Sequence, residues 1–454
     1  MKENRRIVWF TGIAVLAVLC AGTGRLSAGE INTGESLELT LEECIEKGIT
    51  ASPELAGANA EIVQKEAALD LAQRSRWPSL EISGGYTLLS EVENGEIAIP
   101  SGGSISLPSA DSEAVALHFT AAQPVFSGFE IRTGIKNSEK LLGGARLNRR
   151  GTIREIRYRV EQAYWRLVNA AERVEVTGKG VERAESLLKE VRSLFSQGMV
   201  TREDVLRMEM NREQSLLLSL EADHMLQLSM MELDLLIGNT SGKVVRPAYD
   251  FENQDMLPEE FDYQNTLASA FTQRTELQLV QIQKAVQEGE MKKISAAWWP
   301  KISLQGQIRY DNPHTRQFPP ENEFVFSWQI GVMGTISLTR LKNMEPEKAA
   351  AEGAYQELAG REEELVRKIS LQIKKDLLEL ERSRKLLEST ETILAQAKEN
   401  YDIVYNKFRS GSAVNSDVLS AQEKLLNAQL QRTQAFTAQR LAVSQIKYDA
   451  GYGE

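Results

Sequence analysis

The sequence predicts a mainly α-helical protein with a small membrane β part, built as two copies of one structural repeat. Segments of similar sequence return in the same order in the second half of the chain, which indicates a duplication. Apolar residues recur at every seventh position in both halves, which predicts long coiled-coil helices. Short stretches that alternate between apolar and polar residues predict a few strands in each half.

Residues 1–28 have the features of an export signal. A basic start precedes an apolar run, residues 7–19, that is too short for a stable membrane span. Cleavage is expected after Ala28, although small residues before it offer earlier sites. Lipid attachment at Cys20 is an alternative, but Leu19 stands where a small residue normally precedes such a cysteine.

Bulk composition excludes several classes of protein. Beyond the signal, no apolar stretch has the roughly 20 residues of a spanning helix, so strands must make any membrane crossing. The net charge of −11 argues against nucleic acid as a partner. Because Cys44 is the only cysteine after the signal, no intrachain disulfide is expected.

Two pairs of similar segments define the repeat. The stretch at residues 77–84 returns 222 positions later at 299–306, and the stretch at 195–206 returns 213 positions later at 408–419. The shift shrinks because the first copy carries a longer segment between its strand-like stretches.

The repeat sets the expected domain organisation. A first structural repeat spans residues 29–240, a linker with two prolines spans 241–261, and a second structural repeat spans 262–454. Each repeat should contain a helix, a strand, a polar loop, a second strand, a very long helix, a tight turn and another long helix.

The prediction of long helices is based on heptad patterns. A strict repeat of seven residues over this length predicts a left-handed coiled coil. Glycines in the first long helix, such as Gly151 and Gly180, are expected to bend it. The seven-residue seams are Ile153, Val160, Leu167, Val174, Val181, Leu188 and Phe195 in the first copy, and Val366, Ile373, Leu380, Leu387, Leu394, Tyr401 and Phe408 in the second. A neighbouring seam in the first copy is Ile156, Ala163, Ala170, Thr177, Ala184 and Val191.

The strand stretches near residues 80–88, 115–121, 302–310 and 324–332 alternate in polarity. Such alternation suits barrel strands with an apolar outside and a polar inside, and a half-buried soluble sheet is the alternative. The export signal favours the barrel. Four strands cannot close a barrel, and open edges are not tolerated in lipid, so the chain must oligomerise. Two, three or four copies would give eight, twelve or sixteen strands.

Several ordered segments resemble the TolC-like outer-membrane efflux family over nearly the whole chain after the signal. They are residues 39–43 and 52–55 at the first helix, 77–80 before a strand, 123–128 after the second strand, and the Gly…Asp-Val-Leu turn of both copies. The resemblance implies a homotrimer with a twelve-stranded β-barrel, continuous with a coiled-coil periplasmic tunnel. It also implies a cell outer membrane location and a channel in a tripartite efflux or type I secretion system. The implied partners are a periplasmic adaptor, an inner-membrane transporter of RND, ABC or MFS type, and outer-membrane lipid.

The resemblance further assigns Asp204 and Asp417 to an acidic ring at the periplasmic aperture of the tunnel. Both also lie in the first turn of a helix, where the spacing of Thr201 and Asp204 fits a capping box and Asp417 suits the helix dipole. Where relatives carry a polar tether and a second acid, this chain has Phe408, Ala413 and Ser420, so its closed state must use other contacts.

Further candidate residues lie at the helix turns and at the strand starts. The turns at Phe195 and Gly198 and at Phe408 and Gly411 are the implied adaptor-docking sites, and a solvated hairpin end is the alternative. Trp77 and Trp299 stand just before strands and are expected to anchor the protein at the membrane interface.

No catalytic constellation is evident, so we expect a protein that is not an enzyme and has no cofactor or metal. His118, His224 and His314 are isolated from one another and from Cys44, and His118 is expected to face the barrel interior. A periplasmic coiled-coil adaptor or tether without a channel is the rival hypothesis. Two helical hairpins and few strands count against it.

Overall fold

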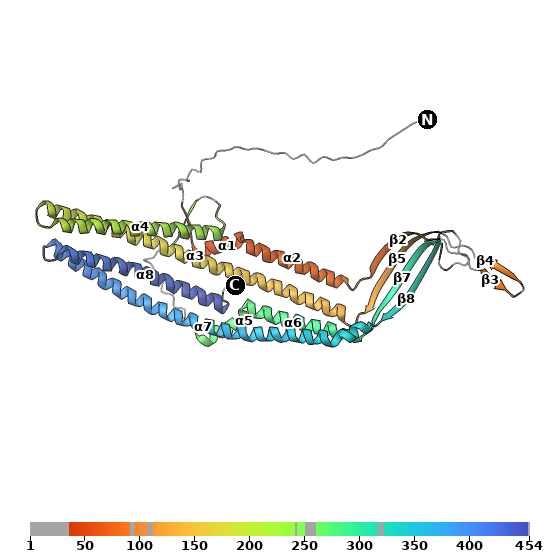
Figure 1. Ribbon diagram of the computed structural model, residues 1–454. Helices are drawn as coiled ribbons and strands as arrows, with labels where there is room; N and C mark the ends of the chain where they lie inside the picture. Colours follow the sequence, from red (N-terminus) through yellow and green to blue (C-terminus); the bar gives the residue numbers. More distant parts are fainter. Residues whose placement is uncertain are drawn as a thin grey trace, which may run out of the picture.

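The molecule is elongated, with a helical bundle at one end and a strongly twisted sheet at the other (Figure 1). This computed structural model describes residues 36–90, 96–100, 102–106, 112–240, 243–249, 260–314, 316 and 322–452. The predicted export signal and its cleavage site lie outside these residues.

Apart from a few short elements, the two halves of the chain contain the same kinds of element in the same order. The first half comprises β1 (Ser36–Leu39), α1 (Leu41–Ala51), α2 (Pro53–Arg74), β2 (Ser79–Leu88), β5 (Glu113–Phe126), α3 (Glu130–Ser196) and α4 (Arg202–Ile237). The second half comprises α5 (Tyr263–Gln273), α6 (Thr275–Ser295), the short 3-10 helix η1 (Ala296–Trp298), β7 (Lys301–Asn312), β8 (Val325–Thr335), α7 (Leu338–Arg409) and α8 (Asn415–Ala450). The predicted fold class, mainly helical and internally duplicated with a small β part, is confirmed.

A single antiparallel sheet joins the two halves. Its strand order is β2-β5-β7-β8, and β5 of the first half pairs directly with β7 of the second. The register places Ile82 opposite Phe119, Phe119 opposite Ile308, and Ile308 opposite Trp328. Since directly paired residues share a face, the alternating apolar residues of all four strands lie on the same side of the sheet.

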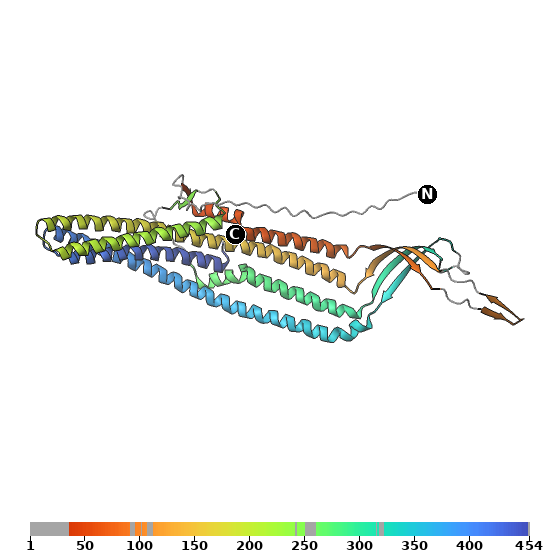
Figure 2. The same ribbon diagram turned by 45° about the horizontal axis from the view of Figure 1, so that its top comes forward.

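Two short sheets depart from the expected organisation. The segment expected to be a polar loop contains β3 (Glu96–Ile99) and β4 (Gly103–Ser106), which pair as a hairpin beyond the main sheet (Figure 2). The segment expected to be a linker contains β6 (Val244–Pro247), which pairs in parallel with β1. The polar-loop prediction was therefore wrong, and the linker starts with a strand that ties the end of α4 back to the start of the first half.

The long helices follow the predicted seams. All six residues of the neighbouring seam in α3 are buried, whereas the main seam is buried at Val160, Leu167 and Leu188 and partly exposed elsewhere. Helix α3 is continuous over 67 residues and contains the glycines at which bends were expected. A Cβ at Gly151 would lie 3.1 Å from Thr275 Cγ2, so this glycine lets the start of α6 approach α3 closely.

The largest apolar core lies midway along the helical part. It unites α1, α3, α4, β6 and α8 around Val160, Leu167, Leu233 and Phe436. None of the helices in the described ranges carries an apolar stretch of the length and hydropathy that a bilayer crossing requires.

Candidate functional site

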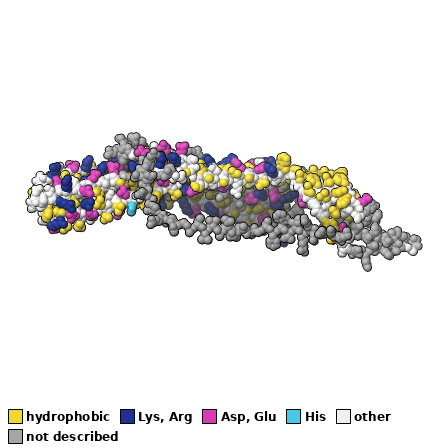
Figure 3. Space-filling view, turned by 90° about the horizontal axis from the view of Figure 1, so that it is seen from above, with side chains coloured by type: hydrophobic (Ala, Val, Ile, Leu, Met, Phe, Trp, Pro, Cys, Tyr) yellow, Lys and Arg dark blue, Asp and Glu magenta, His cyan; other side chains and the backbone are white. Residues whose placement is uncertain are grey.

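One face of the four-stranded sheet is apolar and uncovered. Ile82 on β2 and Val332 on β8 are each 73% exposed, and Figure 3 shows hydrophobic side chains gathered over this part of the molecule. A half-buried soluble sheet would cover these side chains. Because lipid tails solvate such a surface, the face suits the outside of a membrane barrel. Its exposed apolar residues are Leu80, Ile82, Tyr86 and Leu88 of β2, Leu117 and Phe119 of β5, Leu304, Ile308 and Tyr310 of β7, and Phe326, Trp328, Ile330 and Val332 of β8.

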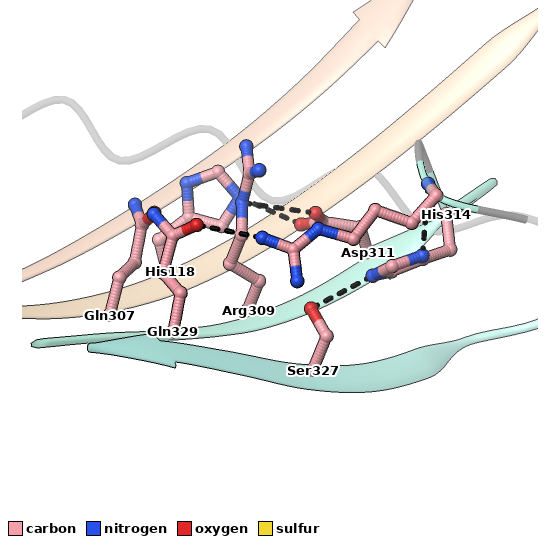
Figure 4. A network of polar contacts seen from close by, with 8 residues as sticks. His118, Gln307, Arg309, Asp311, His314, Ser327 and Gln329 are labelled. Atoms are coloured by element: carbon pink, nitrogen blue, oxygen red, sulfur yellow. Dashed lines mark hydrogen bonds and ion pairs between the residues drawn. The ribbon is translucent and has the colours of Figure 1, made fainter. Parts of the chain in front are cut away.

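The opposite face of the sheet carries a network of polar side chains (Figure 4). Gln329 Nε2 donates to Gln307 Oε1 at 2.8 Å, and an Arg316 guanidinium nitrogen donates to Gln329 Oε1 at 2.7 Å. His314 Nε2 lies 2.8 Å from Ser327 Oγ. His314 and Arg316 follow β7, and their side chains reach back to residues of the polar face.

His118 links the two halves of the chain on this polar face. Its Nε2 lies 2.7 Å from Asp311 Oδ1, and Arg309 Nε lies 3.5 Å from Asp311 Oδ2. His118 thus points to the polar side of the sheet, as predicted. Among the described residues, no three His, Cys, Asp or Glu side chains are grouped to hold a metal ion.

The sheet ends on two unpaired edges. Strands β2 and β8 each pair on one side only within the described chain. Their outer backbone groups would be left without hydrogen bonds in lipid, at a cost of several kcal/mol for each group. The sheet is therefore incomplete as a membrane structure in one chain.

Aromatic side chains mark the junction between sheet and helices. Trp77 precedes β2 and is 74% exposed. Trp299 precedes β7, and its ring packs edge-to-face against Phe126 at 6.1 Å and Phe129 at 6.3 Å between centroids. Both tryptophans thus lie at one level of the molecule, where the apolar sheet meets the polar helices.

The first helix turn joins α3 to α4 at the end farthest from the sheet. Gly198 makes the turn with a φ of +74°, and Phe195 before it is 41% exposed. Thr201 caps α4 in a capping box, because Asp204 N donates to Thr201 Oγ1 while Thr201 N donates to Asp204 Oδ2 at 2.9 Å. The Thr201 hydroxyl, which donates to Asp204 Oδ2 at 2.7 Å, and the Thr201 N–H lower the pKa of Asp204 below its ordinary value.

The second helix turn joins α7 to α8 beside the first. Gly411 makes this turn with a φ of +73°. Phe408 is only 7% exposed, unlike its counterpart in the first turn. The N-cap of α8 is Val414, which has no side-chain hydrogen bond. Asp417 is exposed, and its carboxylate has no partner among the residues that the structure describes.

An apolar cluster holds the two turns together. Phe408 and Val418 of the second hairpin pack with Val191, Val205 and Met208 of the first. Ala413 packs at the margin of this cluster. Phe408 and Ala413, at the positions of the implied polar tether, therefore contribute apolar contacts instead.

One polar contact also crosses between the two turns. The side chain of Asn415 at the start of α8 lies near enough to the Asp204 carboxylate at the start of α4 to contribute to the lowered pKa of Asp204. Asp204 is thus bonded within its own hairpin and has a polar neighbour in the other, whereas Asp417 has no side-chain hydrogen bond among the described residues.

Comparison with known proteins adds a family and a fold. Residues 45–239 and 266–448 match the family model described as outer membrane efflux protein. The VceC outer membrane protein of Vibrio cholerae is similar in structure at 18% identity, with a TM-score of 0.74 over 91% of this chain and 96% of that one. No sequence among curated proteins matches the chain.

Two further solved structures share the fold. The CmeC outer membrane channel of Campylobacter jejuni is 16% identical, with a TM-score of 0.72 over 90% of this chain and 85% of that one. The MtrE outer membrane channel of Neisseria gonorrhoeae, solved in its open state, is 14% identical, with a TM-score of 0.71 over 91% of this chain and 89% of that one.

Proposed function

Because this chain belongs to the outer membrane efflux protein family, we propose that it is the channel subunit of a tripartite efflux or type I secretion system. It is an outer-membrane channel protein that extends into the periplasm. Substrates delivered by an inner-membrane transporter would pass through it without a chemical step. The sheet carries this proposal, since one face is apolar and exposed and the other is polar. The sheet continues directly into helices about 100 Å long.

A homotrimer would complete the structure. Three copies of the four strands give a twelve-stranded barrel with no free edge, wide enough for a water-filled lumen. The outer side of α4 supports the same assembly, because Met210, Leu217 and Met231 are exposed at intervals of seven or fourteen residues. A helix of a neighbouring subunit can cover such a seam. The number three comes from the family.

The helix turns are the proposed docking site for a periplasmic adaptor. They lie at the opposite end of the molecule from the apolar sheet (Figure 2). With the sheet in the outer membrane, they therefore reach farthest toward the inner-membrane transporter. The docking residues would be Phe195, Gly198, Phe408 and Gly411 around the two turns.

Trp77 and Trp299 are proposed as anchors at the periplasmic side of the membrane. Their rings lie where the apolar face ends, the level at which amphipathic aromatic residues are stable in membrane proteins. Such anchors would set the depth of the barrel in the bilayer.

The assembly is testable by fractionation and by conductance. The full chain should sediment with outer membranes, run as a heat-sensitive oligomer about three times the size of the monomer, and form pores in planar bilayers. Recovery as a soluble periplasmic monomer would overturn the channel and favour the coiled-coil tether.

The acidic ring is proposed to lie mainly at Asp417. Three copies of this carboxylate at a narrow mouth would attract cations, and no described residue neutralises it. Asp417→Asn should reduce cation selectivity and weaken block by multivalent cations in planar bilayers. Asp204→Asn is the matched control, since the Asp204 carboxylate is engaged by Thr201 and should affect selectivity less. Equal selectivity in wild type and Asp417→Asn would exclude the ring.

A further inference from the structure

A buried joint lies midway along α7, where this helix changes partner. Toward the turn α7 packs with α8, and toward the sheet it packs with α6 (Figure 1). The end of α8, the α5–α6 turn and α3 all meet there. Arg154 of α3 donates to Gln273 O at 3.0 Å, and Ser269 Oγ of α5 donates to Ala450 O at 3.0 Å. The joint therefore ties the α7–α8 hairpin to the rest of the molecule.

Two carboxyl groups face each other inside this joint. Asp376 of α7 is 6% exposed and Asp449 of α8 is 3% exposed, and the two carboxyl groups are near enough to influence each other electrostatically. One cation reaches the pair, since a guanidinium nitrogen of Arg274 lies 3.2 Å from Asp449 Oδ1. No donor from the described chain reaches Asp376 Oδ2, which is buried.

Apolar residues enclose the pair within the coiled coil. Ile373 and Leu380 of α7 and Ile446 of α8 are buried within one turn of the two carboxyl groups. Asp376 itself occupies a core position, three residues after the seam residue Ile373, where the first copy has small or apolar side chains. A charge placed in such a seam is costly unless it is neutralised.

A single proton would resolve the electrostatic conflict. If both groups were ionised, two buried negative charges would face one arginine. A proton on Asp376 Oδ2 turns that atom into a donor toward Asp449, while Asp449 keeps its ion pair with Arg274. Burial, and then the adjacent Asp449, raise the pKa of Asp376 to about 7.

Neutral and charged groups surround the pair on every element packed against it. Gln372 Nε2 donates to Asp376 Oδ1 at 2.9 Å, and Gln445 Nε2 donates to Asp449 Oδ2 at 2.5 Å. Both are neutral and cannot replace the proton. The charged or titratable neighbours are Arg274 and Glu276 at the α5–α6 turn, Tyr448 on α8, and Tyr158 and Arg166 on α3.

We propose that Asp376 and Asp449 bind one proton between them and that this proton locks the α7–α8 hairpin to the α5–α6 turn. Near and below neutral pH the pair is a carboxylic acid bonded to a carboxylate, and the joint is closed. Above neutral pH the proton leaves, the two carboxylates repel each other, and the hairpin that carries Phe408 and Asp417 gains freedom. The joint is thus a pH-sensitive lock on the second turn.

Hydrogen exchange on the full-length oligomer tests the lock directly. Between about pH 6 and about pH 8, the amide exchange rate at residues 369–380 and 440–450 should rise about tenfold more than the exchange rate of unprotected amides rises over the same range. Asp376→Asn places an N–H donor where the proton would be, and it should remove this excess. Asp402→Asn, an exposed aspartate of the same helix, should leave the excess unchanged. Equal excess in wild type and Asp376→Asn would overturn the proposal.

A second variant tests whether the proton is shared. Asp449→Asn removes the facing charge, so the midpoint of the exchange transition should fall by about one pH unit or more. A midpoint that stays near that of the wild type would also overturn the proposal. This variant remains informative if Asp376→Asn does not fold.

A conductance measurement connects the lock to the proposed channel. Wild-type pores should show a change in open probability over the same pH range, and Asp376→Asn should hold the low-pH behaviour throughout. This measurement rests on the proposed function, whereas the exchange experiment does not. Pores with no pH response together with a normal exchange transition would limit the lock to the hairpin and separate it from channel opening.

Discussion

The two helix turns have the same backbone and nearly the same order of residues, yet they are stabilised differently. Gly198 and Gly411 adopt left-handed φ values of +74° and +73°. The aromatic residue three positions earlier is exposed in the first turn, at Phe195, and buried in the second, at Phe408. The first turn is therefore stable within its own hairpin, whereas the second depends on contact with the first.

The helix starts after the turns show the same division. Thr201 and Asp204 cap α4 with reciprocal hydrogen bonds, while Val414 leaves α8 without a side-chain cap. Duplication thus preserved the backbone of the turn and let the polar and apolar contacts diverge. The second hairpin is held by burial against the first, so it can detach from the first as a unit. The first hairpin keeps its own cap whether or not the two hairpins are in contact.

The largest difference is expected from removing the aromatic rings. Phe408→Ala empties a site in the apolar cluster between the hairpins and should cost about 3–4 kcal/mol of local stability. Phe195→Ala removes a ring that is 41% exposed and should cost about 1 kcal/mol or less. Hydrogen exchange of each turn peptide measures both values. Similar losses at the two turns would refute the asymmetry.

Much of the fold could be predicted because it rests on periodic patterns. The seam that begins at Ile156 is buried at all six positions, and the alternation in four strands gave the correct common face. Such features depend only on spacing along one element. The approximate positions of the two helix turns could also be predicted from the sequence, because Gly198 and Gly411 lie at the same place in two matching segments.

What was missed depends on contacts between elements. The β3–β4 hairpin had a local signal, since Ile97, Ile99 and Ile105 alternate around Gly102 and Gly103, but prolines nearby favoured a loop. The burial of Phe408 but not Phe195 could not be predicted, because both stand at the same heptad position. The pairing of Asp376 with Asp449 also depends on the tertiary fold, although the sequence does place a charged residue, Asp376, at a core position of the heptad pattern.

A smaller effect is expected from exchanging the caps. Thr201→Ala removes the capping hydroxyl and should destabilise the start of α4 by about 1 kcal/mol. Val414→Ser supplies a cap that α8 lacks and should stabilise its start by about 0.5–1 kcal/mol. Val414 is exposed, so the change removes little buried apolar surface. Hydrogen exchange should become faster at the start of α4 in Thr201→Ala and slower at the start of α8 in Val414→Ser. A change in the same direction at both helix starts would count against the comparison.

The smallest expected effect is a difference in acid sensitivity between the turns. The pKa of Asp204 is lowered by Thr201, so its contribution to stability is complete above the unfolded value of 3.8 and is lost as pH falls through the lower folded value. Solvent exposure limits this contribution to roughly a few tenths of a kcal/mol. Pepsin cleavage near residue 199 should therefore accelerate below about pH 4 in the wild type relative to Asp204→Asn at the same pH. The corresponding comparison of wild type with Asp417→Asn near residue 412 should show no such acceleration, because the Asp417 carboxylate bonds to no described residue. An acid step in both turns would show that Asp417 also caps its helix.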